Sequence, residues 1–213
     1  MADRRARPRA GLTRERVLDA ALDFADRHGV AALSMRKLGA ELDVEAMTLY
    51  HYVPNKDALF EAMVDRLVQS LARVEPGDGE DWSAWLIRLG GAFRDALLAH
   101  PGALPVLATR PVTSGPSVEL VESALRYLGR AGFEPPRALD VLNAVMTFVL
   151  GHALAEAGSP PGADESEVDS LANVDGADFP LLALALSAGP RHAERFAFAL
   201  GTLVRGFATA RSR

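Results

Sequence analysis

The chain has 213 residues, of which 49% are hydrophobic and 24% are charged, so it has the composition of a folded globular protein rather than of a disordered segment. It contains no cysteine, which excludes disulfide frameworks, thiolate metal sites and cysteine nucleophiles. The net charge is −5, yet residues 1–60 carry ten basic against nine acidic side chains, and the excess of acidic residues lies in the remainder.

Residues 1–12 form a basic arm that holds Arg4, Arg5, Arg7 and Arg9. Such an arm on an acidic protein is typical of a chain that contacts DNA at one end, although a solvated tail would carry the same charge. The first 16 residues have no apolar stretch, so a secretory signal is not expected. Nowhere do about 18 apolar residues run together, and we therefore expect a cytoplasmic protein with no membrane partner.

Three short helices are predicted at the start of the chain. Thr13 is placed to cap the first helix, whose apolar stripe ends at Gly29. Ser34 is placed to cap the second helix, which a tight turn at residues 43–45 joins to a third helix over about 46–52. An amphipathic helix followed by two short helices with a tight turn between them indicates a helix-turn-helix unit.

Longer helices are predicted from Lys56 onward. Breaks at Pro54–Asn55, at residues 76–79 and at residues 100–102 separate helices that begin near Lys56 and near Trp82. Further helices are expected at about 116–131, 136–157, 180–187 and 190–211, with a mobile, polar loop at 158–176. The prediction is an all-α protein in which Trp82 and Trp85 belong to the core.

The third helix carries side chains suited to reading DNA. In a helix-turn-helix unit the second helix of the pair lies in the major groove, with its first residues against the base edges. Ala46, Met47 and Thr48 have methyl groups that can contact thymine, and Thr48 adds a hydroxyl. Tyr50, His51 and Tyr52 have aromatic rings with polar groups that can form hydrogen bonds to DNA. Lys56, at the start of the next helix, is placed to neutralise a phosphate.

The segment from LTRERV to TLYHYVPNKDAL resembles the DNA-binding domain of the tetracycline-repressor (TetR) family in residue type and spacing over more than forty positions. The resemblance implies that Arg36, Thr48, Tyr50, Tyr52 and Lys56 contact DNA. It also implies that Met35, Ala46, Met47 and His51 lie near the bases. For Tyr50 we expect the ring to pack in the small core while the hydroxyl reaches a phosphate.

The second half of the chain also resembles this family, in WSAWLIRLGGAFRDALLAHPGAL, ATRP, VESALRYLGRAGF and LGTLVRGF. The resemblance implies an N-terminal three-helix DNA-binding domain over residues 1–56 and a larger helical ligand-binding and dimerisation domain over residues 57–213. It implies a homodimeric repressor that binds a near-palindromic operator and is released by a small-molecule effector. An activator or a ligand-independent DNA binder of the same fold stays open.

An enzyme is the alternative from a different class. The sequence has no nucleophile elbow, no HExxH motif, no Gly-rich phosphate loop and no convincing acid–base pair. The five histidines, His28, His51, His100, His152 and His192, are scattered along the chain. We therefore expect a protein that is not an enzyme.

The resemblance also bears on the effector. Family members that bind tetracycline hold its Mg²⁺ with a histidine and a glutamate, and the matching positions here are Val106 and Ala155. Leu89 and Ala124 stand where an asparagine and a glutamine are expected, so we predict an apolar or aromatic effector that is not Mg–tetracycline. The polar or anionic group of this effector would lie near Thr109 and Arg110. The predicted ligand contacts are Leu89, Phe93, Val106, Thr109, Arg110, Ala124, Met146 and His152, and no cofactor or metal is expected.

Two patterns leave alternatives open. His152 and Glu156 share a helix face, a spacing compatible with a structural pair, a ligand contact or a metal site without an apparent third ligand. Apolar stripes mark the helices at 136–157 (Leu142, Val145, Met146, Val149, Ala153) and at 190–211 (Phe196, Leu200, Leu203, Val204, Phe207). These stripes could be buried within one chain, whereas the resemblance implies that both helices pair with their symmetry mates in a four-helix bundle.

Overall fold

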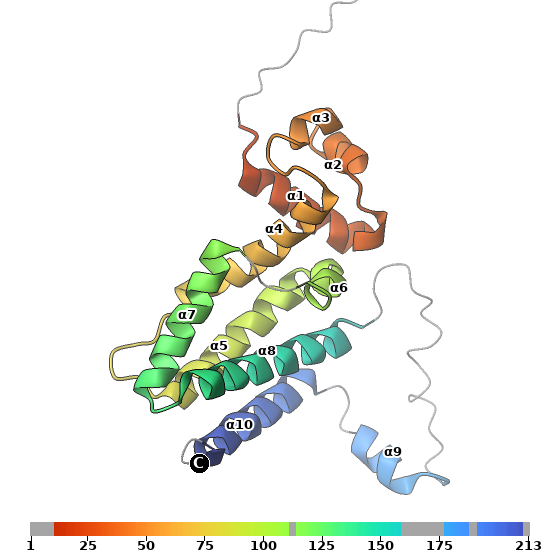
Figure 1. Cartoon of the computed structure of the whole chain (residues 1–213). Coiled ribbons are helices and arrows are strands. Elements are labelled where there is room, and N and C mark those ends of the chain that lie inside the picture. Colours follow the sequence, from red (N-terminus) through yellow and green to blue (C-terminus); the bar gives the residue numbers. More distant parts are fainter. Residues whose placement is uncertain (1–10, 111–113, 159–176, 188–190, 211–213) are drawn as a thin grey trace, which may run out of the picture.

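The computed structural model describes residues 11–110, 114–158, 177–187 and 191–210. Every regular element in those ranges is a helix, and ten of them are α-helices, so the predicted all-α class is confirmed (Figure 1). The predicted basic arm lies outside the described residues apart from residues 11 and 12, and the predicted mobile loop at 158–176 lies outside them apart from Gly158.

The first three α-helices form a small unit at one end of the molecule, α1 (Arg14–His28), α2 (Met35–Glu41) and α3 (Ala46–Leu49). The predicted caps are confirmed, because the side chain of Thr13 accepts the N–H of Arg16 and that of Ser34 accepts the N–H of Lys37. The prediction for α3 was too long: the helix ends at Leu49, and residues 50–52 form turns. The N–H groups of His51 and Tyr52 donate to the carbonyls three residues back, those of Thr48 and Leu49, so the backbone there forms turns instead of continuing the α-helix.

Helix α4 (Lys56–Gln69) joins this unit to the rest of the molecule and continues into a 3₁₀ turn, η2 (Ser70–Arg73). Asn55 caps it by accepting the N–H of Ala58 at 2.8 Å. Leu59, Met63 and Leu67 of α4 are buried in the same cluster as the apolar face of α1. The predicted domain boundary after residue 56 therefore coincides with the start of a helix that belongs to the N-terminal core and extends beyond it.

The larger unit surrounds a second core. It contains α5 (Trp82–Ala99), the 3₁₀ turn η3 (Pro101–Ala103), α6 (Leu104–Leu107), α7 (Gly115–Arg130), α8 (Pro135–Ala157), α9 (Pro180–Leu186) and α10 (His192–Ala210). Helices α5 and α8 pack along each other, with α7 on one side and α10 on the other (Figure 1). Trp82 and Trp85 are buried in this core, as predicted.

The apolar stripes of α8 and α10 are mostly used inside the chain. Leu142, Val145, Val149 and Ala153 of α8 are buried, as are Phe196, Leu200 and Val204 of α10. These residues are therefore buried within one chain, packed with α5, which is the first of the two alternatives. The pairing of α8 and α10 with their symmetry mates stays a prediction. The helix α8 is long and apolar enough to cross a membrane by length and composition, but one face of it is buried in this core.

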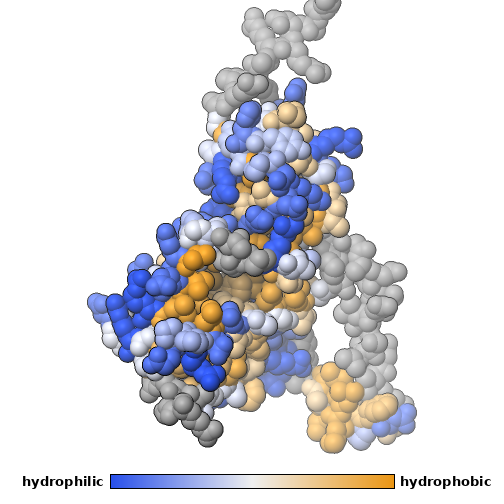
Figure 2. Space-filling model, viewed as in Figure 1, coloured by the Kyte–Doolittle hydropathy of each residue, from blue (hydrophilic) through white to orange (hydrophobic). Residues whose placement is uncertain are grey.

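Helix α9 stands away from the other helices (Figure 1). Its apolar residues face solvent: Leu181 is 82% exposed, and Leu184 and Phe179 are also exposed. Figure 2 shows this helix as a compact hydrophobic body beside the main mass of the molecule. The exposure of these side chains to water is unfavourable, and an apolar surface of this kind is typical of interaction sites.

Candidate nucleic-acid interface and ligand cavity

The close packing of α2 on α3 depends on Gly39 within α2 and on Asp43 in the turn that follows. A Cβ on Gly39 would lie 2.8 Å from the carbonyl oxygen of Val44 and 3.1 Å from the nitrogen of Ala46, so only glycine fits at this crossing. Asp43 adopts a left-handed backbone with φ 54°, a conformation that aspartate tolerates better than most residues. The turn therefore places α3 across α2 in the geometry of a helix-turn-helix.

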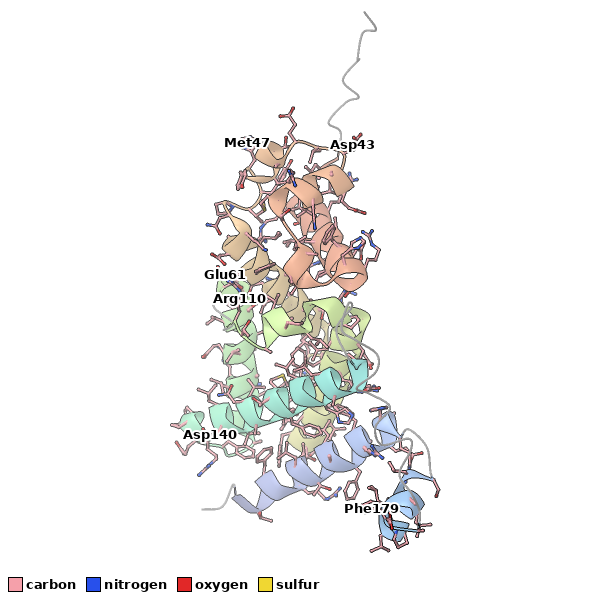
Figure 3. The ribbon with its side chains drawn as sticks, turned by 90° about the vertical axis from the view of Figure 1, so that its right-hand side faces the viewer. Asp43, Met47, Glu61, Arg110, Asp140 and Phe179 are labelled. Atoms are coloured by element: carbon pink, nitrogen blue, oxygen red, sulfur yellow. The ribbon has the colours of Figure 1, made fainter. Side chains whose placement is uncertain are left out.

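The outer side of α3 is exposed at the end of the molecule farthest from α10. Met47 is 69% exposed and marks this tip in Figure 3. Arg36, Tyr50 and His51 are also exposed, whereas Ala46 and Thr48 are half-buried and Leu49 is fully buried. Arg36 of α2 and Met47 of α3 are thus accessible, whereas Met35, which is also expected near the bases, is buried in the small core with Leu38 and Leu49.

The two tyrosines after α3 have different surroundings. Tyr50 is 42% exposed, so the expectation that its ring packs in the small core is wrong. The ring that packs there belongs to Tyr52, whose hydroxyl donates a hydrogen bond to the carbonyl of Leu12 at 3.0 Å. This bond fixes the chain where the basic arm ends and joins the three-helix unit. Spacing alone did not distinguish the two rings, because both flank a helix end.

Charged side chains of both signs gather around Phe60 at the start of α4. The ammonium of Lys56 lies 5.1 Å from the ring centroid of Phe60, and the guanidinium of Arg110 lies 5.3 Å from the same ring. Arg110 also pairs with Asp57 at 2.6 Å and lies 3.9 Å from Glu61, beside which Figure 3 places it. Arg110, which follows α6, is thereby tied to α4, the helix that follows the reading unit, as we call the N-terminal unit of α1, α2 and α3.

The larger unit contains a cavity of about 620 Å³ between the C-terminal end of α4, η2, α5, α7 and α8. Trp85, Leu89 and Phe93 of α5 line it, and apolar residues of α7 border the hollow seen in Figure 2. The indole N–H of Trp85 donates to the carbonyl of Val74 at 2.9 Å, which fixes this wall. Behind it, Tyr127 packs edge-on against Trp85. Burial raises the pKa of the Tyr127 hydroxyl, and nearby Glu80 raises it further, so the hydroxyl remains a hydrogen-bond donor.

Four of the predicted ligand contacts, Leu89, Phe93, Ala124 and Met146, line this cavity together. The other four do not. Val106 is buried in α6, Thr109 donates to the carbonyl of Pro105, Arg110 faces α4, and His152 lies on the seam between α8 and α10. The resemblance to the family implies that these four residues contact the ligand. In this structure their side chains contact other parts of the protein and do not line the cavity.

His152 and Glu156 are both engaged. Glu156 forms a two-pronged ion pair with Arg94 of α5, in which Nε donates to Oε2 at 2.8 Å. The Nε2 of His152 lies 3.1 Å from the carbonyl oxygen of His192 and 3.9 Å from Glu156. Because a carbonyl only accepts, Nε2 carries the proton in this bond. The pair therefore joins α8 to α5 and to the start of α10.

One cluster of possible metal ligands lies where the two units meet. Asp23, Asp26 and His100 place one ligand atom each within 4.8 Å of one another. Both oxygens of Asp26 already accept hydrogen bonds, one from Nδ1 of His100 at 2.8 Å and one from the N–H of Gly102 at 2.9 Å. The hydrogen-bonding geometry thus assigns this cluster to the contact between α1 and η3.

Several lining residues of the cavity were not predicted from the sequence. Val68, Leu71 and Val74 come from the end of α4 and the segment after it, Leu120 and Val121 from α7, and Leu139 and Asn143 from α8. Their amphipathic spacing indicates the side of each helix that faces inward. It does not indicate which stretch of that side borders an empty space, because this depends on how far apart the helices stand.

Comparison with known proteins agrees with this architecture. The family model for bacterial regulatory proteins of the tetR family matches residues 17–63, and the model for the tetracyclin repressor-like C-terminal domain matches residues 75–211. The chain belongs to the TetR family. The tetracycline repressor protein class D of Escherichia coli is 34% identical over 210 residues, covering 93% of this chain and 90% of that protein. Its relatives in this family are transcriptional repressors, which indicates a regulator rather than an enzyme.

Two solved structures of ligand complexes are similar over almost the whole chain. The TetR-family protein ActR of Streptomyces coelicolor in complex with actinorhodin has a TM-score of 0.76 at 25% identity, covering 96% of this chain and 100% of that one. A TetR variant from Acinetobacter baumannii AYE in complex with minocycline has a TM-score of 0.73 at 28% identity, covering 95% and 100%.

Proposed function

We propose that this TetR-family chain is a cytoplasmic, ligand-responsive transcriptional repressor, which binds a near-palindromic operator as a homodimer and leaves it when a small effector binds. The observation that carries the proposal is the position of α4. Its first residue, Lys56, lies beside the reading unit, whereas Val68 near its other end and Leu71 beyond it line the cavity. The helix α4 thus connects the proposed DNA-binding surface with the proposed effector cavity.

The two functions are coupled when an effector has different affinities for two conformations of the protein, typically with about 1–3 kcal/mol of coupling free energy. Besides its apolar packing on α1, α4 has polar contacts with Asp19, Ser117 and Arg110. Arg66 pairs with Asp19 of α1 at 3.1 Å, and Asp65 accepts a hydrogen bond from Ser117 of α7 at 2.9 Å. Arg110 pairs with Asp57. A molecule that moves α7 or η2 would therefore also displace α4 and the reading unit.

For operator contacts we propose the exposed surface of the helix-turn-helix. Ala46, Met47, Thr48 and His51 are placed to meet base edges, and Arg36, Tyr50 and Lys56 to meet phosphates. Tyr52 takes part through the arm that its hydroxyl holds. In a two-fold dimer, two such surfaces would reach half-sites spaced by one helical turn, about 34–36 Å.

For the homodimer we propose a face of α8 and α10 that keeps Leu203 and Phe207 of the predicted stripes and adds residues beside them. A shallow groove runs between these helices, with apolar side chains that include Phe148, Phe198 and Leu203. Phe198 is 74% exposed and small residues such as Ala199 and Gly206 flank it, so a second helix pair can approach closely. A second copy would remove this apolar surface from water, and α9 offers more of the same kind.

For the effector we propose a polycyclic or aromatic molecule in the cavity. A volume of about 620 Å³ lies within the range of small-molecule sites, and the walls are predominantly apolar. Leu89, Phe93, Ala124 and Met146 are the predicted contacts that line it. Val106 and Ala155 supply no metal ligand, so we expect Mg–tetracycline at micromolar concentration not to release the DNA.

The test is selection of tight binders from a pool of random duplexes with the purified protein. We expect a palindromic consensus and an affinity that falls steeply as salt rises, because phosphate contacts release counterions. Lys56→Ala should weaken binding to the selected duplex without changing dimerisation. Arg137→Ala, an exposed substitution on α8 far from the reading unit, is the matched control. No enrichment, also after unfolding and refolding to strip bound ligand, would refute the proposed function.

A further inference from the structure

The described residues that line the cavity include one acidic side chain and no basic one. Among the described residues that line it, none is lysine, arginine or histidine. The single charged lining residue is Glu75, and the uncharged polar ones are Ser123 and Asn143. All three are exposed, so they form the rim, whereas the deeper wall is made of Trp85, Leu89 and Phe93.

The two basic side chains of α5, Arg88 and Arg94, do not neutralise Glu75, because each is paired with another glutamate. Arg88 donates to the backbone carbonyl of Glu75 at 2.8 Å, but its charge is paired with the carboxylate of Glu80 through two hydrogen bonds, of 2.6 and 3.1 Å. Arg94 is paired with Glu156. Within the described part of the chain, no cation pairs with the carboxylate of Glu75. That carboxylate therefore remains available to a ligand.

From this charge distribution we infer the chemical class of the effector: a flat apolar molecule that is neutral or cationic and not anionic, with Glu75 as the counter-ion of an ammonium group at the rim. The inference rests on the proposed function insofar as it takes this cavity as the effector site. It replaces the anionic group that the sequence predicted near Arg110, since Arg110 is committed to Asp57 outside the cavity.

Desolvation decides against an anion. A carboxylate or phosphate that enters the apolar part of the cavity loses its hydration and finds no cation there, which is strongly unfavourable. An ammonium beside Glu75 stays partly hydrated and gains an exposed ion pair, which is worth at most about a fivefold increase in affinity. The hydroxyl of Ser123 and the amide of Asn143 add uncharged hydrogen bonds for a phenol, ketone or alcohol.

The experiment compares three probes with the same bicyclic ring, 1-naphthylmethylammonium, 1-naphthylmethanol and 1-naphthoate, by isothermal titration calorimetry on the full-length protein without DNA. We expect the ammonium to bind about twofold to fivefold more tightly than the alcohol, and the carboxylate about tenfold or more weakly than the alcohol. Equal or tighter binding of the carboxylate would overturn the inference. Absence of binding by all three probes would overturn it as well, because the cavity would then not accept flat apolar molecules.

Variants locate the effect. Glu75→Gln should remove the preference for the ammonium over the alcohol while leaving the alcohol affinity unchanged, and an undiminished preference would refute the role of Glu75. Glu119→Gln, an exposed glutamate of α7 that does not line the cavity, is the matched control and should change nothing. Ala124→Trp should block all three probes. Ser123→Trp does the same from an exposed rim position if the interior substitution prevents folding.

The two proposals fail in distinguishable ways. If the order of the three probes holds but none of them releases the selected duplex, the coupling to DNA fails and the charge assignment of the cavity stands. If the duplex is released by an anionic molecule that competes with the naphthyl probes, the charge assignment fails and the regulatory function stands.

Discussion

The carboxylate of Asp26 in α1 lies 2.8 Å from the Nδ1 atom of His100, which follows α5, and its other oxygen accepts the N–H of Gly102. These bonds seat η3 on α1 and so join the N-terminal unit to the larger one. The approach is very close: a Cβ on Gly102 would lie 2.1 Å from the carbonyl oxygen of Ala25. Only glycine allows the two backbones to meet at this distance.

The first prediction concerns this junction. Gly102→Ala places a methyl group against backbone atoms that have no room to yield, so we expect a loss of about 1–3 kcal/mol in the free energy of unfolding. Gly91→Ala is the control, because its Cβ would have no heavy atom within 4 Å and it lies inside α5. That change should stabilise by up to about 1 kcal/mol. Denaturant unfolding measures both, and an unaffected Gly102→Ala would mean that η3 does not rest on α1 in solution.

The second prediction concerns the ion pair between Arg94 and Glu156, whose side chains are 16% and 17% exposed. Breaking a fully buried pair costs about 3–5 kcal/mol. Because this pair is partly hydrated, we expect Glu156→Gln to cost about 1–3 kcal/mol of stability. Glu122→Gln removes a solvent-exposed pair with Arg126 and should cost about 0.5 kcal/mol or less. Equal losses in the two variants, measured by urea unfolding, would contradict the proposed difference in burial.

The third prediction is a pH dependence at Glu80. Hydrogen bonds from Arg88 and from the N–H of Gly77 lower the pKa of this carboxyl below its ordinary value of 4.5. A carboxyl whose pKa is lower in the folded state stabilises the protein above its unfolded pKa, and this stabilisation is lost as the pH falls through the folded pKa. The stability advantage of the wild type over Glu80→Gln should thus be full at neutral pH and disappear below 4.5. A difference that stays constant in acid, measured by urea midpoints, would contradict it.

The fourth prediction separates two roles for Tyr52 and rests on the proposed DNA binding. If the hydroxyl acts by holding the carbonyl of Leu12, Tyr52→Phe should weaken operator binding and lessen its salt dependence, because the arm loses phosphate contacts. The same change should then have no further effect in a chain that lacks residues 1–10. A persistent effect in the shortened chain, measured by fluorescence anisotropy over a salt series, would assign the hydroxyl a direct DNA contact instead.

Local rules determined the elements of the N-terminal unit. Thr13, Ser34 and Gly29 each specify a helix boundary through hydrogen bonds within a few residues, and sequence therefore predicts them well. The same holds for the turn between α2 and α3, whose residue types and spacing by themselves indicate the helix-turn-helix. The predicted α3 is too long because apolar and aromatic residues continue past Leu49, whereas the N–H groups of His51 and Tyr52 bond only three residues back and form turns.

Only the tertiary structure determined which helices pack against each other and which side chains line the cavity. An apolar stripe such as Leu142, Val145 and Val149 specifies that a helix face is buried, and the packing of α5 decides that it is buried within one chain. Arg110 is itself a predicted ligand contact, yet its ion pair with Asp57 of α4 holds it outside the cavity. Helical periodicity is set by hydrogen bonds four residues apart, whereas a cavity or a long-range ion pair is set by the distances between helices, which no local pattern encodes.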